Sequence, residues 1–383
     1  MSPDGSLLYV TVQTTSSVKC NLFYAPLSNM KRILIIRPSS IGDIIMASPM
    51  IKVLREAYPK AYLAWLVEPS LAELLRHHPG LDELICWPKA EWENLLKQGR
   101  LFALAREVRK LASELRLRNF DTALDAQGLL RSRVLAFLSG APQRVGLDSR
   151  EPGRFLMTKM CLPTPNSKRM SSEYYDLMQG LGLSPKEFHP DVVVSIEDQR
   201  AAACQLHAEG IGERYAVMCP FTTRPQKHWF IERWAALSAA IHDSLALPTV
   251  LLGGPQDIDG SRRIQVLGKV RIHDLTGKVT LGQAAAVVKH STLVVGVDTG
   301  LTHMGVAFDR PTIALFGATR PYLSTASPSS IVLYDELPCS PCRRSPTCNN
   351  EFTCMKSISV ERILNAAKNL LKRPGIGQCT SCT

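Results

Sequence analysis

The sequence predicts an α/β protein made of two doubly wound domains, each a parallel sheet with helices on both faces. Short apolar strands alternate with helical patterns of about 10–15 residues, which is typical of parallel sheets covered by helices. This alternation runs through the chain twice, with a break between Ser184 and Gly212. The length of 383 residues also suits two domains of about 150–200 residues each.

The first series opens with Ile33–Ile36, a short β-branched run bounded by Pro38, as expected for a buried parallel strand. Asp43–Ala57 carries apolar residues at helical spacing, and Pro59 ends this pattern. The other elements expected in this series are strands at Tyr62–Val67, Leu84–Trp87, Thr122–Leu124 and Val145–Leu147, and helices at Leu71–His77, Leu101–Leu117 and Leu129–Leu138.

The second series starts near Tyr215 and repeats the alternation. Ligands of such sheets bind beyond the carboxyl ends of the strands, so two facing domains predict a site in a deep cleft between them. The expected strands are Tyr215–Cys219, Pro248–Leu252, Ile272–Leu275, Thr292–Val297 and Pro311–Phe316, and the expected helices are Ile231–Ser244, Asp259–Leu267, Leu281–His290 and Gly300–Ala307.

The composition excludes several classes of protein. Apolar residues make up 45% and charged residues 21%, as in ordinary globular proteins, and there is no apolar run long enough for a membrane-spanning helix. The net charge is +11, and Arg100–Met170 alone holds 14 Lys or Arg against 6 Asp or Glu. This local excess favours an anionic partner: a phosphate-rich ligand, an acidic membrane surface or a nucleic acid. A solvated face explains any single one of these residues equally well.

The chain ends and the cysteines carry separate expectations. Residues 1–29 read as an extension before Met30, with an edge strand at Leu7–Val12 as the alternative, and 372–383 as a flexible tail. No secretory signal is recognisable, so the eleven cysteines predict reduced thiols in the cytoplasm. We predict no metal; the alternative is a four-thiolate site whose later spacings are irregular, formed by Cys339, Cys342, Cys348 and Cys354.

The turn after the first strand, Arg37–Asp43, lies at the expected ligand-binding edge. Gly42 permits another backbone or a ligand to come close, and the amides that open the next helix favour anions. Ser40 or Asp43 also fits a helix cap, which the spacing alone favours. The turn is not a dinucleotide fingerprint, because Gly-x-Gly-x-x-Gly is absent.

Three turns of the second series carry polar residues at strand ends. Thr222 and Thr223, with Arg224 and Lys227, make a phosphate cradle plausible. In the loop 253–259, Asp257 and Asp259 could hold a divalent metal, but carboxylates at a helix start favour capping. At 297–303, the first helical amides favour a phosphate, and Asp298 or Thr299 could equally cap the helix.

Four of these segments together resemble glycosyltransferase family nine, the ADP-heptose:lipopolysaccharide heptosyltransferases. The resemblance covers about Met30 to Leu371. Its motifs are Arg37-x-Ser39-Ser40-x-Gly42-Asp43, Asp125-x-Gln127-Gly128-Leu129-x-x-Ser132, Thr222-Thr223 with Lys227-x-Trp229, and Val297-Asp298-Thr299-Gly300-Leu301-Thr302-His303.

The resemblance implies a GT-B fold with an acceptor-binding domain at 30–195 and a donor-binding domain at 212–371. The second domain would include the cysteine-rich loop 338–355. The implied reaction is inverting, metal-independent transfer of heptose from ADP-heptose, the donor substrate, to the inner core of lipopolysaccharide. It would take place at the cytoplasmic face of the inner membrane, with the protein bound peripherally.

The resemblance also implies roles for individual residues. Asp43 would be the general base and Lys227 would neutralise the diphosphate, so these two would be the catalytic pair. The donor would be held by Thr222, Thr223, Thr299, Gly300, Asp298 and His303, and at its nucleoside end by Gln256 and Asp257, where relatives often carry Glu. The acceptor would be held by Ser40, Gly42, Gln127, Arg131 and Arg150.

The implied partners are the nucleotide sugar, an acidic phosphorylated glycolipid and the membrane surface, with the protein as a monomer and no cofactor required. Nucleic acid is not expected, because no module that binds RNA or DNA is recognisable. Two other functions remain open from the sequence. One is a sugar-nucleotide epimerase of the same fold, and the other is a catalytically silent, metal-containing protein with a basic binding face.

Overall fold

The computed structural model describes residues 30–373 apart from 320, 326 and 343–344. The expected extension at 1–29, its alternative strand at Leu7–Val12 and the tail from 374 onwards lie outside the described residues. Within the described ranges, none of the helices combines the length and the apolar character needed to cross a membrane.

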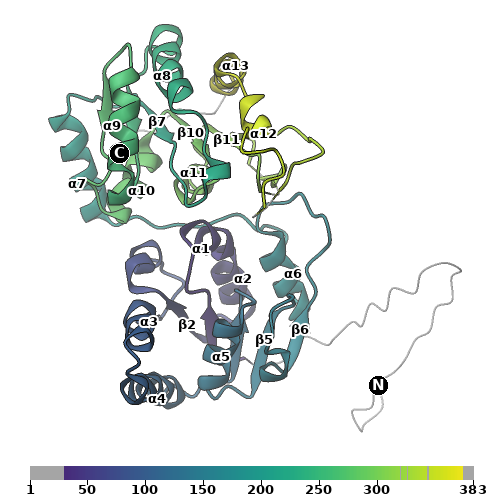
Figure 1. Cartoon of the computed structure of the whole chain (residues 1–383). Coiled ribbons are helices and arrows are strands. Elements are labelled where there is room, and N and C mark those ends of the chain that lie inside the picture. Colours follow the sequence, from purple (N-terminus) through teal and green to yellow (C-terminus); the bar gives the residue numbers. More distant parts are fainter. Residues whose placement is uncertain (1–29, 320, 326, 343–344, 374–383) are drawn as a thin grey trace, which may run out of the picture.

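Two six-stranded sheets form the centres of two domains (Figure 1). Every strand pairs in parallel with its neighbours, in the orders β3-β2-β1-β4-β5-β6 and β12-β11-β10-β7-β8-β9. The strands of the N-terminal sheet are β1 Arg32–Ile36, β2 Tyr62–Val67, β3 Glu83–Cys86, β4 Thr122–Asp125, β5 Gln143–Leu147 and β6 Lys159–Cys161. Those of the C-terminal sheet are β7 Ala216–Cys219, β8 Thr249–Leu251, β9 Ile272–Asp274, β10 Leu293–Val297, β11 Thr312–Leu315 and β12 Ser330–Leu333.

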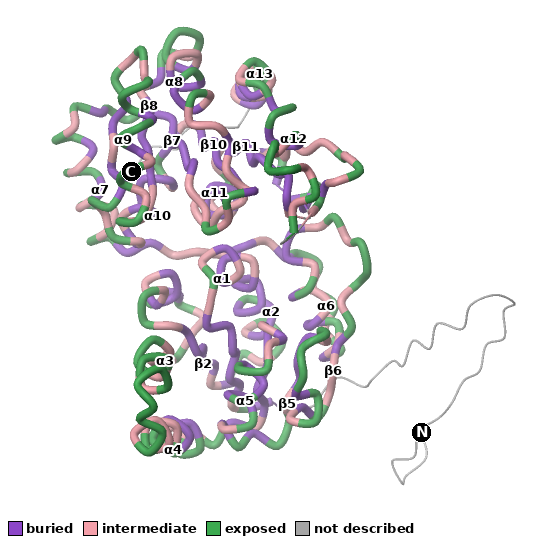
Figure 2. Tube along the Cα trace, viewed as in Figure 1, coloured by how far each residue is buried: buried purple, intermediate pink, exposed green. Residues whose placement is uncertain are grey.

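The central strands are mostly apolar, as expected where helices cover both faces of each sheet. All of β10 is buried, and four of the five residues of β1 are buried. Figure 2 shows buried segments in purple around the labels of β7 and β10. The helices of the N-terminal half are α1 Ile41–Ala47, α2 Pro49–Ala57, α3 Lys89–Lys97, α4 Leu101–Leu117, α5 Leu130–Leu138 and α6 Ser172–Gly180, with the 3-10 helices η1 Pro69–Leu74 and η2 Arg154–Leu156. Those of the C-terminal half are α7 Ile196–Ala208, α8 Ile231–Leu245, α9 Ile258–Leu267, α10 Leu281–His290, α11 Gly300–Ala307, α12 Thr353–Lys356 and α13 Val360–Leu371, with η3 Pro225–Lys227 and η4 Pro255–Asp257.

The expected two series of strands and helices are confirmed, with three local differences. The helix expected at Asp43–Ala57 is two helices, because Pro49 starts a new helix and the Ser48 hydroxyl bonds back to the Ile45 carbonyl. The expected helix Leu71–His77 is the 3-10 turn η1. The sequence interpretation missed α3, β6, α6, α7, β12, α12 and α13.

The two domains meet where α1 packs against α11, at the middle of Figure 1. One buried apolar cluster continues through this junction, from Ile44 of α1 to Met304 of α11. A second contact lies beside it, since the Gly282 amide at the start of α10 donates to Glu73 Oε2 of η1 at 3.0 Å. The carboxyl ends of both central strands therefore face one shared region.

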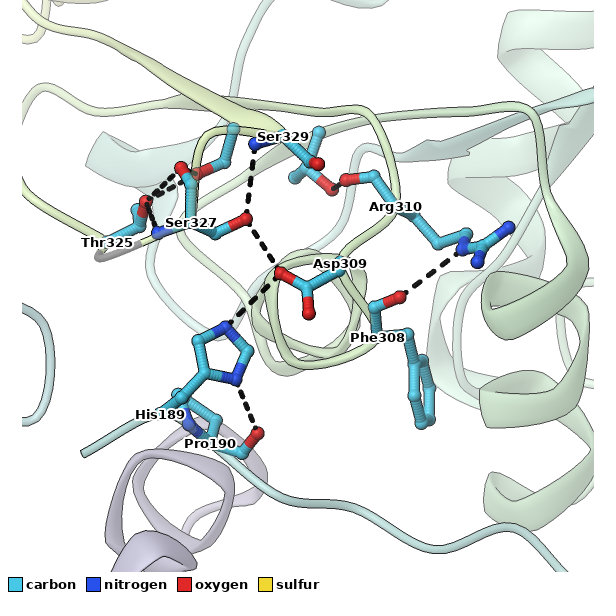
Figure 3. A network of polar contacts seen from close by, with 10 residues as sticks. His189, Pro190, Phe308, Asp309, Arg310, Thr325, Ser327 and Ser329 are labelled. Atoms are coloured by element: carbon cyan, nitrogen blue, oxygen red, sulfur yellow. Dashed lines mark hydrogen bonds and ion pairs between the residues drawn. The ribbon is translucent and has the colours of Figure 1, made fainter. Parts of the chain in front are cut away.

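The segment that crosses between the domains is fixed to both of them. Its Asp191 amide donates to Ser48 Oγ in the N-terminal domain at 2.7 Å. On the other side, His189 Nε2 lies 3.5 Å from Asp309 Oδ1, which also accepts from Ser327 Oγ (Figure 3). These contacts hold the crossing segment against both domains in the arrangement seen here.

Candidate active site

Asp43 lies in the first turn of α1, and its two carboxylate oxygens have different surroundings. Oδ2 accepts from Arg37 at 2.6 Å, from the Ser40 hydroxyl at 2.7 Å and from the Ser40 amide at 3.3 Å. Oδ1 accepts no hydrogen bond from the described part of the chain, and the side chain is 35% exposed. The expected capping role of Ser40 and Asp43 is confirmed, but it uses only Oδ2. One carboxylate oxygen of Asp43 thus stays available.

Arg37, which the sequence analysis gave no role, holds this carboxylate in place. Its side chain is buried, and its other terminal nitrogen donates to the Ala126 carbonyl at 3.0 Å, just beyond β4. The guanidinium also lies 5.7 Å from the ring centre of Tyr174 on α6. A guanidinium fixed by neighbouring elements in this way sets the orientation of Asp43. The sequence signal was an arginine at the end of a buried strand, six residues before the aspartate.

Opposing effects act on the pKa of Asp43, and the lowering ones prevail. Burial raises the pKa of Asp43, but the charge of Arg37 and the hydrogen bonds from Ser40 and Arg37 lower it by more. The pKa therefore lies below the usual aspartate value. The carboxylate is therefore ionised at neutral pH and able to accept a proton.

Asp298 has the opposite arrangement, because both of its oxygens are occupied. Lys227 Nζ lies 2.6 Å from Oδ2, and the Thr319 hydroxyl donates to the same oxygen at 2.6 Å. His303 Nε2 lies 3.3 Å from Oδ1, while its Nδ1 lies 2.7 Å from the hydroxyl of buried Tyr322. The side chain of Asp298 is only 13% exposed. Asp298 is thus the centre of a buried polar network that fixes Lys227 and His303.

Burial raises the pKa of Asp298, but its contacts with His303 and Lys227 outweigh this effect and hold the pKa far below the usual range. Burial and the nearby Asp298 charge raise the pKa of Tyr322 well above its ordinary value. Asp298 therefore remains an anion, and Tyr322 remains a neutral hydroxyl that can hydrogen-bond to His303. Neither Thr319 nor Tyr322 belongs to a motif that the sequence analysis singled out.

The two aspartates belong to adjoining turns of the two domains. A Cβ added to Gly42 would lie 2.6 Å from His303 Cδ2, and one added to Gly300 would lie 2.3 Å from Ile41 Cγ2. Only glycine at both positions lets the start of α1 and the start of α11 come this close. The close approach expected at Gly42 is confirmed. The residues that approach it are His303 and Gly300 of the opposite domain.

The residues expected around a diphosphate lie on this side of the C-terminal sheet. Thr299 is the N-cap of α11 and Gly300 its first residue, without a side-chain capping bond. The Thr222 hydroxyl donates to the Asp298 carbonyl at 3.2 Å, so Thr222 joins the β7 turn to the β10 turn, and the neighbouring Thr223 is exposed. The amides at the start of α11 and the Lys227 ammonium thus form a region that favours an anion.

Gln256 and Asp257 lie in the turn η4 after β8. Asp257 Oδ2 accepts from the Gly254 amide at 2.8 Å, which confirms the expected capping role, and Gln256 is exposed. The structure gives neither residue a contact with Asp298 or Lys227.

The residues expected on the acceptor side fall into two groups. Ser40, Gly42 and Gln127 lie together, since the Gln127 amide group donates to the Ser39 carbonyl at 3.4 Å. Arg131 on α5 and Arg150 in the loop after β5 are exposed and form no hydrogen bond or ion pair with Ser40, Gly42 or Gln127. Arg133, also on α5, was missed by the sequence analysis; it is buried and donates to the carbonyls of Glu151 and Pro152 and to Ser149.

Asp125 fixes the turn that leads into α5. It is fully buried, and its Oδ1 accepts from the amides of Gln127 and Gly128, both at 3.0 Å. Gly128 has a φ of 69°, which favours glycine. Burial raises the pKa of Asp125 although these amides oppose the change. Asp125 thus places Gln127 next to the turn that carries Asp43.

The cysteine-rich loop is described apart from residues 343–344. All four thiols at positions 339, 342, 348 and 354 are unpaired. In the part of the chain that the structure describes, no group of three or more His, Cys, Asp or Glu side chains is arranged to hold a metal ion. Burial, and after it the neighbouring thiols of the loop, raise the pKa of Cys342 and of Cys354, and the four-thiolate alternative stays a prediction.

Taken together, the site combines an ionised carboxylate with one available oxygen and, in the opposite domain, a helix start with a fixed lysine. The first can accept a proton and the second can stabilise a phosphate anion. This arrangement suits transfer of a group from a phosphate leaving group to a hydroxyl.

Known proteins resemble this chain in sequence and in fold. Lipopolysaccharide heptosyltransferase 1 of Escherichia coli K12 is 28% identical over 296 residues, which is 76% of this chain and 89% of the relative. Its counterpart in Pseudomonas aeruginosa is 28% identical over 335 residues, covering 84% of this chain and 88% of the relative. The structure of E. coli heptosyltransferase WaaC with ADP is 25% identical, with a TM-score of 0.67 over 88% of this chain and 99% of that one.

A family 9 glycosyltransferase from Veillonella parvula shares the fold with a TM-score of 0.74 at 22% identity, over 89% of this chain and 97% of that one. These neighbours have the GT-B fold of two Rossmann-like domains, so the expected fold class is confirmed. The sequence profile described as glycosyltransferase family 9 (heptosyltransferase) matches residues 108–352, well over half of the chain. The chain therefore belongs to glycosyltransferase family 9, and it is a glycosyltransferase of the heptosyltransferase kind.

Proposed function

We propose that this chain transfers heptose from ADP-heptose to the inner core of lipopolysaccharide, with inversion at the anomeric carbon. Its sequence relatives are named lipopolysaccharide heptosyltransferases, and WaaC has been solved with ADP and with ADP-2-deoxy-2-fluoro heptose. The observation that carries the proposal is the available Oδ1 of Asp43, which lies in the turn packed against the start of α11.

In the proposed reaction, Asp43 Oδ1 takes the proton of an acceptor hydroxyl as that oxygen attacks the anomeric carbon of the donor. The new bond between carbon and acceptor oxygen forms while the bond from carbon to the β-phosphate oxygen breaks. ADP leaves with the bonding electrons of that second bond. A single displacement of this kind inverts the configuration, and one carboxylate is enough to assist it.

The negative charge that grows on the β-phosphate would be stabilised by Lys227 and by the amides of Thr299 and Gly300. Asp298 would hold Lys227 in position, because the ion pair between them measures 2.6 Å in a largely buried setting. His303 would act from the other side of Asp298 and shape the wall next to Gly42. Close packing of α1 on α11 would limit the access of water, which would otherwise hydrolyse the donor.

Binding would be divided between the domains, with the donor in the C-terminal domain and the acceptor in the N-terminal one. Thr222 and Thr223 would line the diphosphate, while Gln256 and Asp257 would face the nucleoside end. Ser40, Gly42, Gln127, Arg131 and Arg150 would receive the acidic, phosphorylated acceptor. The protein would act as a monomer without a cofactor, peripherally bound to the cytoplasmic face of the inner membrane.

The proposal is tested by incubating the full chain with ADP-heptose and lipopolysaccharide that lacks inner-core heptose. We expect ADP release and heptose incorporation only when both substrates are present, and an anomeric configuration opposite to that of the donor by NMR. Conversion of the donor without an acceptor would instead indicate an epimerase. Absence of turnover with this pair, or retention of configuration, would contradict the proposal.

A further inference from the structure

Helix α5 leaves an apolar stripe uncovered. Leu130, Val134 and Phe137 are 41%, 37% and 48% exposed, and their spacing of four and three residues places them on one side of the helix. The turn η2 lies beside the helix: a Cβ added to Gly153, just before η2, would touch Leu130. Phe155 of η2 is 84% exposed. We call Leu130, Val134, Phe137 and Phe155, with the arginines around them, the α5–η2 face.

Arginines alternate with these apolar side chains. Arg131 and Arg154 are exposed next to Leu130 and Phe155 in the chain, and the Arg144 guanidinium lies 5.8 Å from the ring centre of Phe137. Residues 130–160 hold six Lys or Arg and two acids. Of the acids, Asp148 lies 3.6 Å from Arg154, and Glu151 is exposed. The α5–η2 face is therefore both apolar and positively charged.

The basic surface continues into a groove between α4 and α5. The groove has a volume of about 500 Å³; its lining includes Arg109, Arg116 and the apolar side chains of Val108 and Leu138. Arg116 also donates to the Leu138 carbonyl, at 3.3 Å. Figure 2 shows exposed segments in green along these helices at the lower end of the N-terminal domain.

The α5–η2 face is held by buried hydrogen bonds and is connected through the chain to the active site. Buried Arg133 holds the loop before η2 through the carbonyls of Glu151 and Pro152. The stripe begins at Leu130, two residues after Gly128, and the turn before it is bonded to the Ser39 carbonyl through Gln127. A molecule lying along this face would thus end beside the turn that carries Asp43.

We propose that the α5–η2 face docks on the surface of a bilayer that contains anionic lipids. Aromatic and aliphatic side chains would enter the interfacial region, and the arginines would meet the lipid phosphates. An apolar stripe with a net positive charge around it fits the interface of an anionic bilayer, which offers an acyl boundary for the rings and phosphates for the arginines. The stripe fits this surface better than a nucleic acid, which would leave Val134 and Leu130 without a role. The delivery of a lipid-anchored acceptor to Asp43 rests on the proposed function, whereas the docking itself does not.

Flotation of the full chain with vesicles tests the docking without any sugar substrate. The vesicles are phosphatidylcholine with and without phosphatidylglycerol, at low and high salt. We expect binding that needs phosphatidylglycerol and weakens with salt. Phe137→Ser combined with Phe155→Ser should reduce the partition coefficient at least about tenfold, since both rings lose their place in the interface. Arg154→Gln should reduce it about fivefold, the effect of one basic side chain near a charged membrane.

Val266→Ser on α9 is the matched control, because Val266 is 79% exposed in the other domain and should not affect binding. Phe102→Ser at the far end of α4 tests the location, since Phe102 is 96% exposed but outside the α5–η2 face. The proposal is overturned if the double variant binds as wild type does, if wild type ignores anionic vesicles, or if Phe102→Ser alone abolishes binding. It is also overturned if the double variant removes a concentration-dependent dimer seen by sedimentation.

Activity assays then separate this proposal from the proposed function. With an acceptor dissolved in detergent, the double Phe variant should keep its kcat/KM, whereas with the same acceptor in anionic vesicles its kcat/KM should fall. A variant that binds vesicles poorly but transfers normally in detergent supports the docking face and the reaction together. Vesicle binding by a chain that lacks any transfer activity would support the face and reject the reaction.

Discussion

Asp43 and Asp298 both lie just beyond the carboxyl end of a central strand, Asp43 in the first turn of α1 after β1 and Asp298 before the N-cap of α11 after β10, yet their carboxylates differ. Asp43 is 35% exposed, and its three contacts all fall on Oδ2. Asp298 is 13% exposed, with Lys227 and Thr319 on one oxygen and His303 on the other. Both carboxylates have a lowered pKa, but only Asp43 has an oxygen left to accept a proton.

The difference shows how one topology serves two chemical tasks. An aspartate with one oxygen held and one available is suited to act on a substrate. An aspartate with both oxygens held can only position its neighbours, here a lysine and a histidine. The number of available oxygens, and not the low pKa that both share, distinguishes a reacting carboxylate from a positioning one.

The largest expected effect comes from Asp43→Asn. The amide has the same shape but cannot take a proton, so kcat should fall by about 10²–10⁴-fold. The affinity for ADP, measured by calorimetry, should remain near that of wild type, because Asp43 belongs to the other domain. Near-normal turnover in this variant would remove Asp43 from the role of base.

Asp298→Asn should mainly lower the free energy of unfolding. It removes the charge partner of Lys227 in a largely buried setting, which is expected to cost about 3 kcal/mol in the free energy of unfolding. The denaturant midpoint measures this loss, and Asp257→Asn, in a more exposed turn, is the control.

The ion pair of Asp298 with Lys227 also makes the free energy of unfolding depend on pH, in a direction that can be predicted. Because the pKa of Asp298 is lowered on folding, its stabilisation is present above the ordinary carboxyl pKa and is lost as the pH falls through the folded-state pKa. The stabilities of wild type and Asp298→Asn should therefore converge in strong acid. A difference that stays constant down to low pH would contradict the charge-based account.

Lys227→Ala should weaken ADP binding by about 10–100-fold, the range for loss of one hydrogen bond to a charged group. Lys269→Ala is the matched control, since Lys269 is an exposed lysine of the same domain away from the network. An ADP affinity that is the same in both variants would show that Lys227 does not contact the diphosphate.

Arg37→Met should change kcat/KM at neutral pH the least of these variants. Its main effect should be on kcat/KM at acidic pH. Without the guanidinium the pKa of Asp43 rises, so the acidic limb of the kcat/KM profile should move up by about 1–3 pH units. Arg37→Lys keeps the charge and should restore most of the wild-type profile. If the limb stays in place in the Met variant while the Tm falls, Arg37 is only structural.

Much of the fold and part of the site could be predicted from the sequence. The bounds of β2, α4, α10 and α11 agree with the expected ones, because each combines a clear hydrophobic period with a clear stop. The four motif turns were correctly placed at strand ends. Helices such as α7, rich in alanine and polar residues, were missed because few apolar side chains mark their period.

The sequence by itself determined two doubly wound domains and the candidate residues, because buried parallel strands and helix starts leave local patterns of apolar and capping residues. Only the tertiary structure decided that Gly42 contacts His303 and that Gly300 contacts Ile41. It also decided that Arg37 and Arg133 are buried and hold neighbouring segments by hydrogen bonds, and which oxygen of Asp43 is available. These facts depend on packing between segments up to about 260 residues apart in the chain, where side-chain volume and desolvation select the partners and local periodicity carries no information.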